Sequence, residues 1–168
     1  MISENLKQIY DSIINSIQTK GINSADLQDL LIVAADGFKE DEQWAKKVTA
    51  YIKQCCEYSM RMNREILQMD ALWWETMKVE APYLFESFML YMEKNRPPEE
   101  RFYEPRRNPL KQVADAIQEL ADDLLDELFI NMPSRVGKTQ IVKFAFLWWG
   151  SRNTELSNLY TAFSDKIT

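Results

Sequence analysis

The chain has 168 residues, of which 46% are hydrophobic and 27% are charged, the balance of a globular protein rather than a disordered one. The 20 basic and 26 acidic side chains give a net charge of −6, which argues against a free-standing nucleic-acid-binding module, because such modules present a basic face. The absence of histidine excludes histidine-based catalytic triads and histidine-liganded zinc. The two cysteines, Cys55 and Cys56, are neighbours and supply neither a thiolate metal cage nor a disulfide framework.

Residues 1–94 have the apolar spacing of helices. Apolar residues from Leu6 to Ile17 recur at i, i+3, i+4 and i+7, which predicts a helix that ends at Gly21. Similar spacing predicts a second helix that is capped by Ser24 and ends at Gly37, and a third helix from about Asp41 to Tyr58. Two further helices are predicted to begin at Asp70 or Ala71 and at Pro82. We therefore expect a small helical domain over residues 1–94.

The rest of the chain changes character. Residues 95–109 contain four prolines and four arginines, which exclude a continuous helix and predict a linker at a domain boundary. Apolar spacing over residues 110–124 predicts another helix. Residues 127–132 then form an apolar run of strand length, followed by a predicted buried helix over residues 139–149 and a second predicted strand over residues 157–163. This order is the opening of an α/β domain.

Between the first predicted strand and the buried helix the sequence reads Pro133-Ser134-Arg135-Val136-Gly137-Lys138-Thr139. This is the place and composition of a phosphate-binding loop, in which backbone N–H groups and the helix dipole hold phosphates. Gly137 would allow close backbone approach, Lys138 would reach the β- and γ-phosphates, and the Thr139 hydroxyl would bind Mg²⁺. The general pattern has a glycine where this chain has Met132, so the alternative is a surface turn that merely contains Gly-Lys-Thr.

The loop and its flanks resemble the large terminase subunits of tailed bacteriophages and of prophages of Gram-positive bacteria. In that family the first glycine of the Walker A loop is often missing, and an arginine stands three places before the lysine, as Arg135 stands before Lys138. The flanking segments that share this resemblance are residues 101–107, 129–132 and 162–168. The resemblance covers roughly residues 80–168, and residues 1–94 would be a helical accessory domain.

Large terminases are ATP-driven motors that package viral DNA into capsids and carry a separate nuclease domain. The resemblance implies that ATP is bound by Pro133, Ser134, Arg135, Val136, Gly137, Lys138 and Thr139, with Mg²⁺ on Thr139. It implies catalytic roles for Lys138 and for Arg135, which would contact the γ-phosphate and sense hydrolysis. It also makes Tyr103, Arg106 and Gln112 candidates for binding adenine. The implied partners of the full-length protein are double-stranded viral DNA, the portal and the small terminase subunit, with a monomer in solution that forms a ring on a portal.

A hydrolysing site also needs an acidic Walker B pair at the end of another strand. Asp122-Asp123 and Asp126-Glu127 precede the loop, so they do not supply that pair. The fold class predicted is therefore mainly α followed by the start of an α/β P-loop NTPase domain, with residues 110–168 truncated before Walker B and before any nuclease residues. We expect a part of a longer protein or a truncated prophage product, and no ATP hydrolysis by this chain alone.

Two classes of function stay open. The first is the ATP-binding module of a terminase motor, and the second is a non-enzymatic helical interaction domain, docking a small terminase subunit or portal, with an inert P-loop remnant. A small-molecule kinase is disfavoured, because the preceding helix and the linker have no place before its first strand. The amino terminus lacks the features of a signal peptide, and the most apolar run, residues 141–150, is shorter than the roughly 20 residues that span a bilayer. We therefore expect a protein of the bacterial host cytoplasm with no membrane partner.

Overall fold

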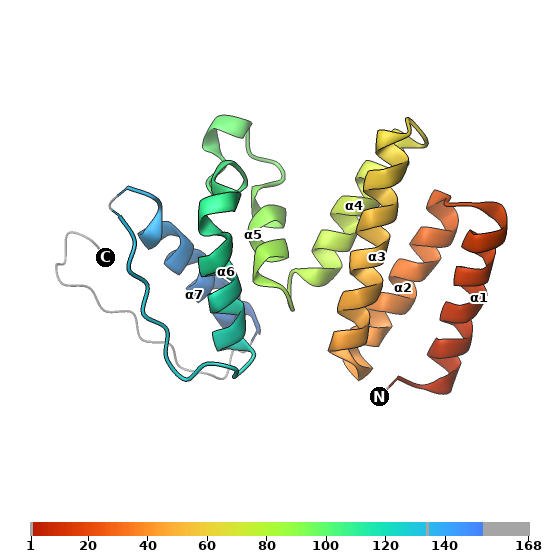
Figure 1. Cartoon of the computed structure of the whole chain (residues 1–168), viewed down its shortest axis with the longest axis horizontal. Coiled ribbons are helices and arrows are strands. Elements are labelled where there is room, and N and C mark those ends of the chain that lie inside the picture. Colours follow the sequence, from red (N-terminus) through yellow and green to blue (C-terminus); the bar gives the residue numbers. More distant parts are fainter. Residues whose placement is uncertain (1, 134, 153–168) are drawn as a thin grey trace. The chain divides into compact units, whose positions relative to one another are not determined.

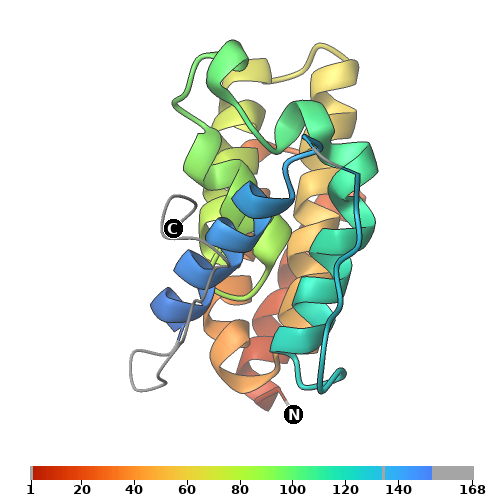
Figure 2. The same cartoon turned by 90° about the vertical axis from the view of Figure 1, so that its left-hand side faces the viewer.

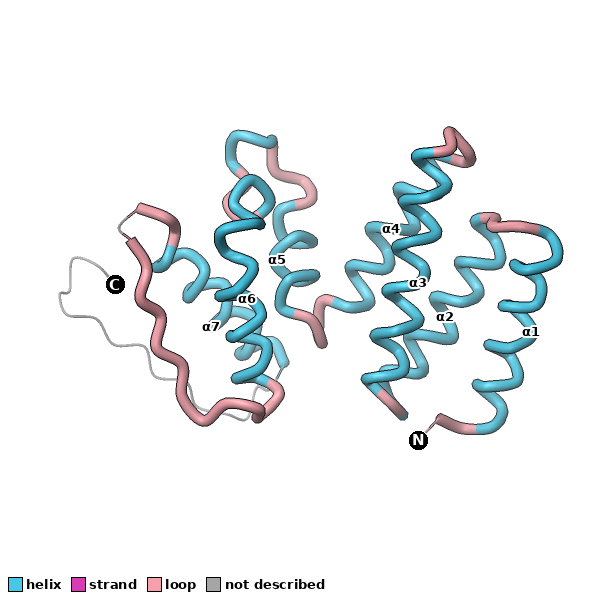
Figure 3. Tube along the Cα trace, viewed as in Figure 1, coloured by secondary structure: helices cyan, strands magenta, loops and turns pink. Residues whose placement is uncertain are grey.

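The computed structural model describes residues 2–133 and 135–152, and every regular element in this part of the chain is a helix (Figures 1 and 3). The α-helices are α1 (Glu4–Lys20), α2 (Ser24–Glu40), α3 (Glu42–Arg61), α4 (Ile66–Glu80), α5 (Phe85–Glu93), α6 (Arg107–Ala121) and α7 (Lys138–Arg152). Two short 3-10 helices, Pro98–Glu100 and Glu104–Arg106, precede α6. The chain divides into two compact units, residues 1–83 and residues 84–168. The prediction of a mainly helical chain is confirmed.

Polar side chains at the amino ends of α1, α2 and α3 explain where these helices begin. The side-chain oxygens of Ser3, Asn23 and Asp41 accept hydrogen bonds from the backbone N–H three residues further on, at 3.4, 2.9 and 3.1 Å. Such capping satisfies N–H groups that have no acceptor inside the helix. The cap of α2 is thus Asn23 rather than the predicted Ser24, which is the first residue of the helix.

Helix α2 also continues past its predicted end at Gly37. A Cβ added to Gly37 would lie 2.6 Å from Cζ3 of Trp44, at the start of α3. The glycine therefore serves close packing between two helices rather than helix termination, and α2 ends at Glu40. Sequence reasoning could not separate these two uses of glycine, because the partner ring comes from a different helix.

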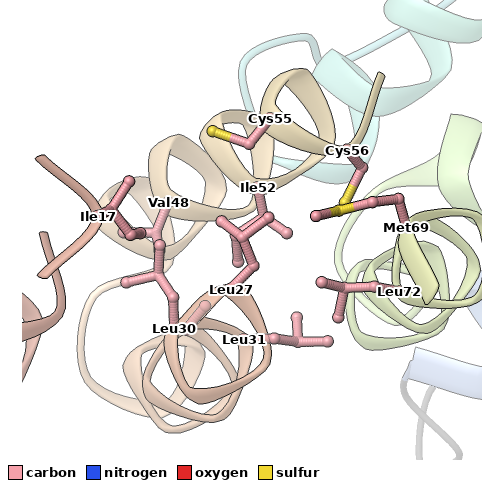
Figure 4. Packing of buried hydrophobic residues seen from close by; sticks show 11 residues of the cluster. Ile17, Leu27, Leu30, Leu31, Val48, Ile52, Cys55, Cys56, Met69 and Leu72 are labelled. Atoms are coloured by element: carbon pink, nitrogen blue, oxygen red, sulfur yellow. The ribbon is translucent and has the colours of Figure 1, made fainter. Parts of the chain in front are cut away.

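The core of the first unit is built from all four of its helices. Its buried side chains are Ile17, Leu27, Leu30, Leu31, Ala34, Val48, Ile52, Cys55, Cys56, Met69 and Leu72. Figure 4 shows Cys56 of α3 beside Met69 of α4, within this cluster. Burial raises the pKa of the Cys56 thiol to about 12 and also raises the pKa of Cys55. Both thiols therefore stay protonated and act as small apolar core groups.

Helices α5, α6 and α7, together with Tyr103 from the segment before α6, supply the core of the second unit. Its buried apolar side chains are Phe85, Met89, Leu90, Tyr103, Leu110, Ala114, Ile117, Ile141, Phe144, Ala145 and Trp148. Trp148 of α7 is fully buried and packs against Phe85 of α5, with ring centroids 5.2 Å apart. Leu147, on another side of α7, is 61% exposed. Neither α7 nor any other helix among the described residues is long and apolar enough to span a bilayer.

Residues 101–103, in the middle of the segment predicted as a linker, are packed into the second unit, whereas residues 95–100 and 104–109 are exposed. The carboxylate of Glu93, which is 1% exposed, accepts the backbone N–H groups of Phe102 and Tyr103 at 2.8 and 2.9 Å. The prolines of this segment begin two short 3-10 helices instead of loosening the chain. The division between the two units accordingly falls between residues 83 and 84, ahead of this segment.

Residues 127–132, predicted as the strand before the loop, do not form a strand. They are part of a stretched-out loop that runs beside α6 in both Figure 1 and Figure 2. A strand requires a neighbouring strand as backbone partner, and a helix offers none along its length because its own N–H and C=O groups are paired. Phe129, central in this segment, is 88% exposed. The predicted start of an α/β P-loop domain is thus not seen in the described residues, and the second predicted strand, residues 157–163, lies outside them.

Candidate phosphate-binding loop

The chain turns sharply just before α7, and two residues of the turn have positive φ. Arg135 has φ 67° and Gly137 has φ 101°. For a residue with a side chain, such as Arg135, this conformation costs about 1–3 kcal/mol and persists only where the surroundings hold it. Helix α7 begins at Lys138, so the N–H groups of its first residues have no acceptor inside the helix and lie at the positive end of its dipole. This arrangement suits an anion.

Lys138 and Thr139, the two residues predicted to bind phosphate and Mg²⁺, are both exposed in the first turn of α7. The Lys138 side chain folds back over the loop, and its Nζ lies 3.5 Å from the carbonyl oxygen of Met132. An open hollow of about 440 Å³ is lined by Pro133, Arg135, Gly137, Lys138, Thr139 and Gln140. Val136 is half-buried, and Ser134 lies outside the described residues. The structure thus brings most of the predicted loop residues to one hollow.

Gly137 faces an aromatic ring. A Cβ added at this residue would lie 2.7 Å from Cζ of Phe102 and closer still to Cε2. The Phe102 ring is also nearly parallel to the ring of Phe144 in α7, at 15° with centroids 6.0 Å apart. The sequence predicts that a phosphate lies close to Gly137, whereas in the structure the side of Gly137 where a Cβ would point is occupied by Phe102.

The three predicted adenine-binding residues lie in different surroundings. Tyr103 is fully buried, and its hydroxyl donates to Glu86 Oε1 at 2.9 Å, so its ring is not at the surface. Arg106 is exposed, with its guanidinium 5.5 Å above the ring of Phe102. Gln112 is exposed on α6 and lines the groove between that helix and residues 128–132.

Phe102 and Glu93 are the residues that sequence reasoning missed. In the sequence, Phe102 stands out only as part of the segment that carries the family resemblance, and Glu93 has no predicted role. No spacing rule links either residue to Gly137, because they are far apart in sequence and meet only in the folded second unit. The one sequence signal was the aromatic pair Phe102-Tyr103 within an otherwise polar, proline-rich stretch.

A polar network supports this part of the unit around Glu86 of α5. Its Oε1 accepts from Arg107 Nε at 2.8 Å as well as from the Tyr103 hydroxyl, and Lys111 Nζ lies 3.5 Å from Oε2. Burial alone would raise the pKa of Glu86, but the hydrogen bonds from Arg107 and Tyr103, with the charges of Arg107 and Lys111, outweigh it and lower the pKa. Burial, together with Glu86, raises the pKa of Tyr103. The network therefore holds an ionised carboxylate next to a protonated phenol.

We expect the second unit to lose stability as the pH falls below 4.5, the ordinary pKa of a glutamate. Because the pKa of Glu86 is lower in the folded state than in the unfolded chain, its contribution is complete above that value and is lost as the pH falls through the folded-state pKa. Thermal unfolding between about pH 7 and pH 3 measures this decline. Glu86→Gln should weaken the unit at pH 7 and flatten the decline, while Glu119→Gln, at an exposed position of α6, should do neither. An equal acid response in wild type and Glu86→Gln would contradict the assignment.

The described residues contain no group of three or more acidic or cysteine side chains that could hold a metal ion. Asp122 accepts hydrogen bonds from Gln118 at 3.0 Å and lies 3.9 Å from Arg152, the last residue of α7. It is therefore at the end of α7 opposite the loop. The Thr139 hydroxyl fits one coordination position of Mg²⁺, and phosphate oxygens and water would have to supply the others.

Comparison of the chain with family models, with curated proteins and with solved structures gives no match. The interpretation of the site accordingly depends on the loop, on the residues around it and on the resemblance of its sequence. None of these observations depends on the first unit.

Proposed function

We propose that residues 133–139 bind the phosphates of ATP, and that the chain is the ATP-binding amino-terminal portion of a phage or prophage terminase large subunit, the motor that packages viral DNA. One observation carries the proposal: Lys138 and Thr139 occupy the first turn of α7, directly after a turn with positive φ at Arg135 and Gly137. An exposed helix start with a lysine and a hydroxyl beside it has the chemistry that polyphosphate with Mg²⁺ requires.

Each loop residue has a proposed role. The N–H groups at the start of α7 contact phosphate oxygens, and the Lys138 amino group moves from Met132 to the β- and γ-phosphates. Its contact with the Met132 carbonyl is long for a hydrogen bond, so little free energy opposes this movement. Arg135, which is exposed, contacts the γ-phosphate, and Thr139 binds Mg²⁺.

We assign the base of the nucleotide to the neighbouring groove. This groove has a volume of about 310 Å³ and lies between α6 and residues 128–132. Its lining ends at Met132, and the lining of the phosphate hollow begins at the next residue, Pro133. Gln112 lines the groove, and its carboxamide offers both a donor and an acceptor for the edge of adenine. Tyr103, being buried, contributes only through its neighbours.

We do not expect this chain to hydrolyse ATP by itself. Hydrolysis needs a carboxylate that orients the attacking water and a second one on the metal. The described residues that line the hollow include no carboxylate. The double-stranded DNA, portal and small-subunit contacts of a terminase belong, in this proposal, to the assembled full-length motor.

Mg²⁺-ATP should raise the unfolding temperature of the second unit. A ligand present at 100 times its Kd stabilises a protein by about 2.7 kcal/mol, which corresponds to about 10–20 °C for a unit of this size. Calorimetry is the suitable measurement, because two compact units can unfold in separate transitions. Lys138→Ala should abolish the shift. Lys143→Ala removes the same charge from an exposed position of the same helix and should preserve it.

Two results would refute ATP binding at this loop. One is a wild-type protein that neither ATP nor ADP stabilises. The other is a Lys138→Ala variant that responds as strongly as the wild type. Loss of the shift in both lysine variants would indicate a general effect of charge on α7 rather than a specific phosphate contact.

The second candidate function is a helical interaction domain that docks a small terminase subunit or a portal. One observation favours it: exposed apolar side chains gather where α3 turns into α4. They are Tyr58, Met62, Ile66 and Leu67, of which Leu67 is 82% exposed. A protein that lacks any response to ATP but binds such a partner through these residues would support this function over the first.

A further inference from the structure

Phe102 is held in place from several sides. The Glu93 carboxylate accepts its backbone N–H at 2.8 Å, and Arg106 donates to its carbonyl oxygen at 3.0 Å. Its ring has the Phe144 ring nearly parallel to it, and the Arg106 guanidinium lies over it. Because Glu93 is 1% exposed and also accepts the N–H of Tyr103, the position of Phe102 is tied to the core of the unit.

The candidate phosphate-binding loop depends on this ring for its shape. Gly137, at φ 101°, lies against Phe102, and Arg135, two residues earlier, has a φ that is unfavourable for a side chain. Conformations of this kind persist only where neighbouring groups hold them. A smaller side chain at position 102 would leave a space beside Gly137 into which residues 135–138 could relax.

We propose that Phe102 is a positioning residue that holds residues 135–138 in the conformation that accepts phosphate, and that Glu93 fixes Phe102 in turn. The consequence for nucleotide binding rests on the proposed function. The contact between Phe102 and the loop does not. The two parts can therefore be tested separately.

The first test measures the loop without nucleotide. Trypsin cleaves after Arg135 and Lys138, both of which are exposed, and cleavage of a folded protein follows the population of its open form. Phe102→Leu should speed cleavage at these two positions by about tenfold. Phe88→Leu is the matched control, because the Phe88 ring also packs against Phe144, at 6.4 Å between centroids, but comes from α5. It should leave cleavage of the loop unchanged.

The second test measures the affinity for Mg²⁺-ATP well below the unfolding temperature. Phe102→Leu should weaken binding by about tenfold, and Phe88→Leu should change it by less than about twofold. Gly137→Ala should also weaken binding, because its methyl group would collide with the Phe102 ring. If Phe102 acts through Gly137, the two losses will not add in the double variant.

Glu93→Gln provides a second variant should Phe102→Leu fail to fold. It replaces one of the two carboxylate acceptors by a donor and leaves the Phe102 ring intact. It should speed cleavage after Arg135 and Lys138 and weaken ATP binding in the same direction as Phe102→Leu.

The outcomes separate the two claims. Cleavage and affinity that stay at wild-type values in Phe102→Leu, or losses that add fully with Gly137→Ala, overturn the positioning role. A loosened loop with unchanged ATP affinity overturns the role in binding. If the wild type binds no ATP while Phe102→Leu still loosens the loop, the proposed function and the phosphate role of Phe102 both fail, and the loop contact stands.

Discussion

Trp148→Ala should destabilise the second unit by about 3–5 kcal/mol and leave the stability of the first unit unchanged. Trp148 is fully buried, and its ring packs against Phe85 and beneath the guanidinium of Arg152, 4.6 Å from the ring centroid. Removing the Trp148 ring leaves a large cavity between α5 and α7. The neighbouring side chains can close this cavity only in part, because the core of the second unit is small. Hydrogen exchange, or calorimetry at increasing denaturant concentration, measures the stability of each unit separately.

The matched control is Trp149→Ala, the adjacent residue of α7. Trp149 is half-buried and packs edge-on against Phe146, at 5.9 Å between ring centroids. Its loss should cost clearly less than that of Trp148. Equal losses in the two variants, or a loss from the first unit, would show that the second unit is not organised around Trp148.

Lys53→Ala should destabilise the first unit by about 3 kcal/mol. Lys53 Nζ lies 2.7 Å from Glu80 Oε2, and the Glu80 side chain is only 1% exposed. Removing the lysine leaves the carboxylate in the core without this ion pair, and breaking a buried pair from one side is far more costly than removing both partners. Lys53 itself is 21% exposed, which places the expected loss at the lower end of the range for buried pairs.

Two comparisons make this prediction specific to the buried pair. Lys46→Ala breaks an i,i+4 pair with Glu42 within α3, and should cost only about 0.5 kcal/mol beyond its side-chain contacts. Replacing both Lys53 and Glu80 by apolar residues should recover most of the stability that Lys53→Ala loses. A double variant that is weaker than Lys53→Ala would contradict the argument. The nucleotide response of the second unit should be the same in all of these variants, because none of the three residues belongs to that unit.

Several helices of this chain could be predicted because their causes are local, although α4 begins at Ile66 rather than at Asp70 or Ala71, and α5 begins at Phe85 rather than at Pro82. The apolar spacing from Leu6 to Ile17 and the stop at Gly21 correspond to α1, and the cap Asp41 stands where α3 begins. In each case the residues that determine the helix lie within it or next to it. Helix α7 likewise begins at Lys138, one residue before the predicted start.

Two of the predictions that were wrong concern groups whose partners lie on another element of the fold. Gly37 predicts a helix end, but in the structure the Trp44 ring occupies the space that a side chain at position 37 would need. Residues 127–132 have the composition of a strand, yet they lie beside α6, which cannot pair with them. Composition predicts which residues are compatible with a strand, whereas a sheet also needs a second strand beside the first.

The candidate site shows the same contrast. The sequence by itself determined the motif from Pro133 to Thr139, including a lysine and a hydroxyl at the start of a helix, because these residues are consecutive and their chemistry is local. Only the tertiary structure decided that Tyr103 is buried, that Gln112 lines a neighbouring groove, and that Phe102 occupies the space beside Gly137. The physical reason is that burial and steric contact depend on how α5, α6 and α7 pack, and side chains far apart in sequence meet only when that packing has formed.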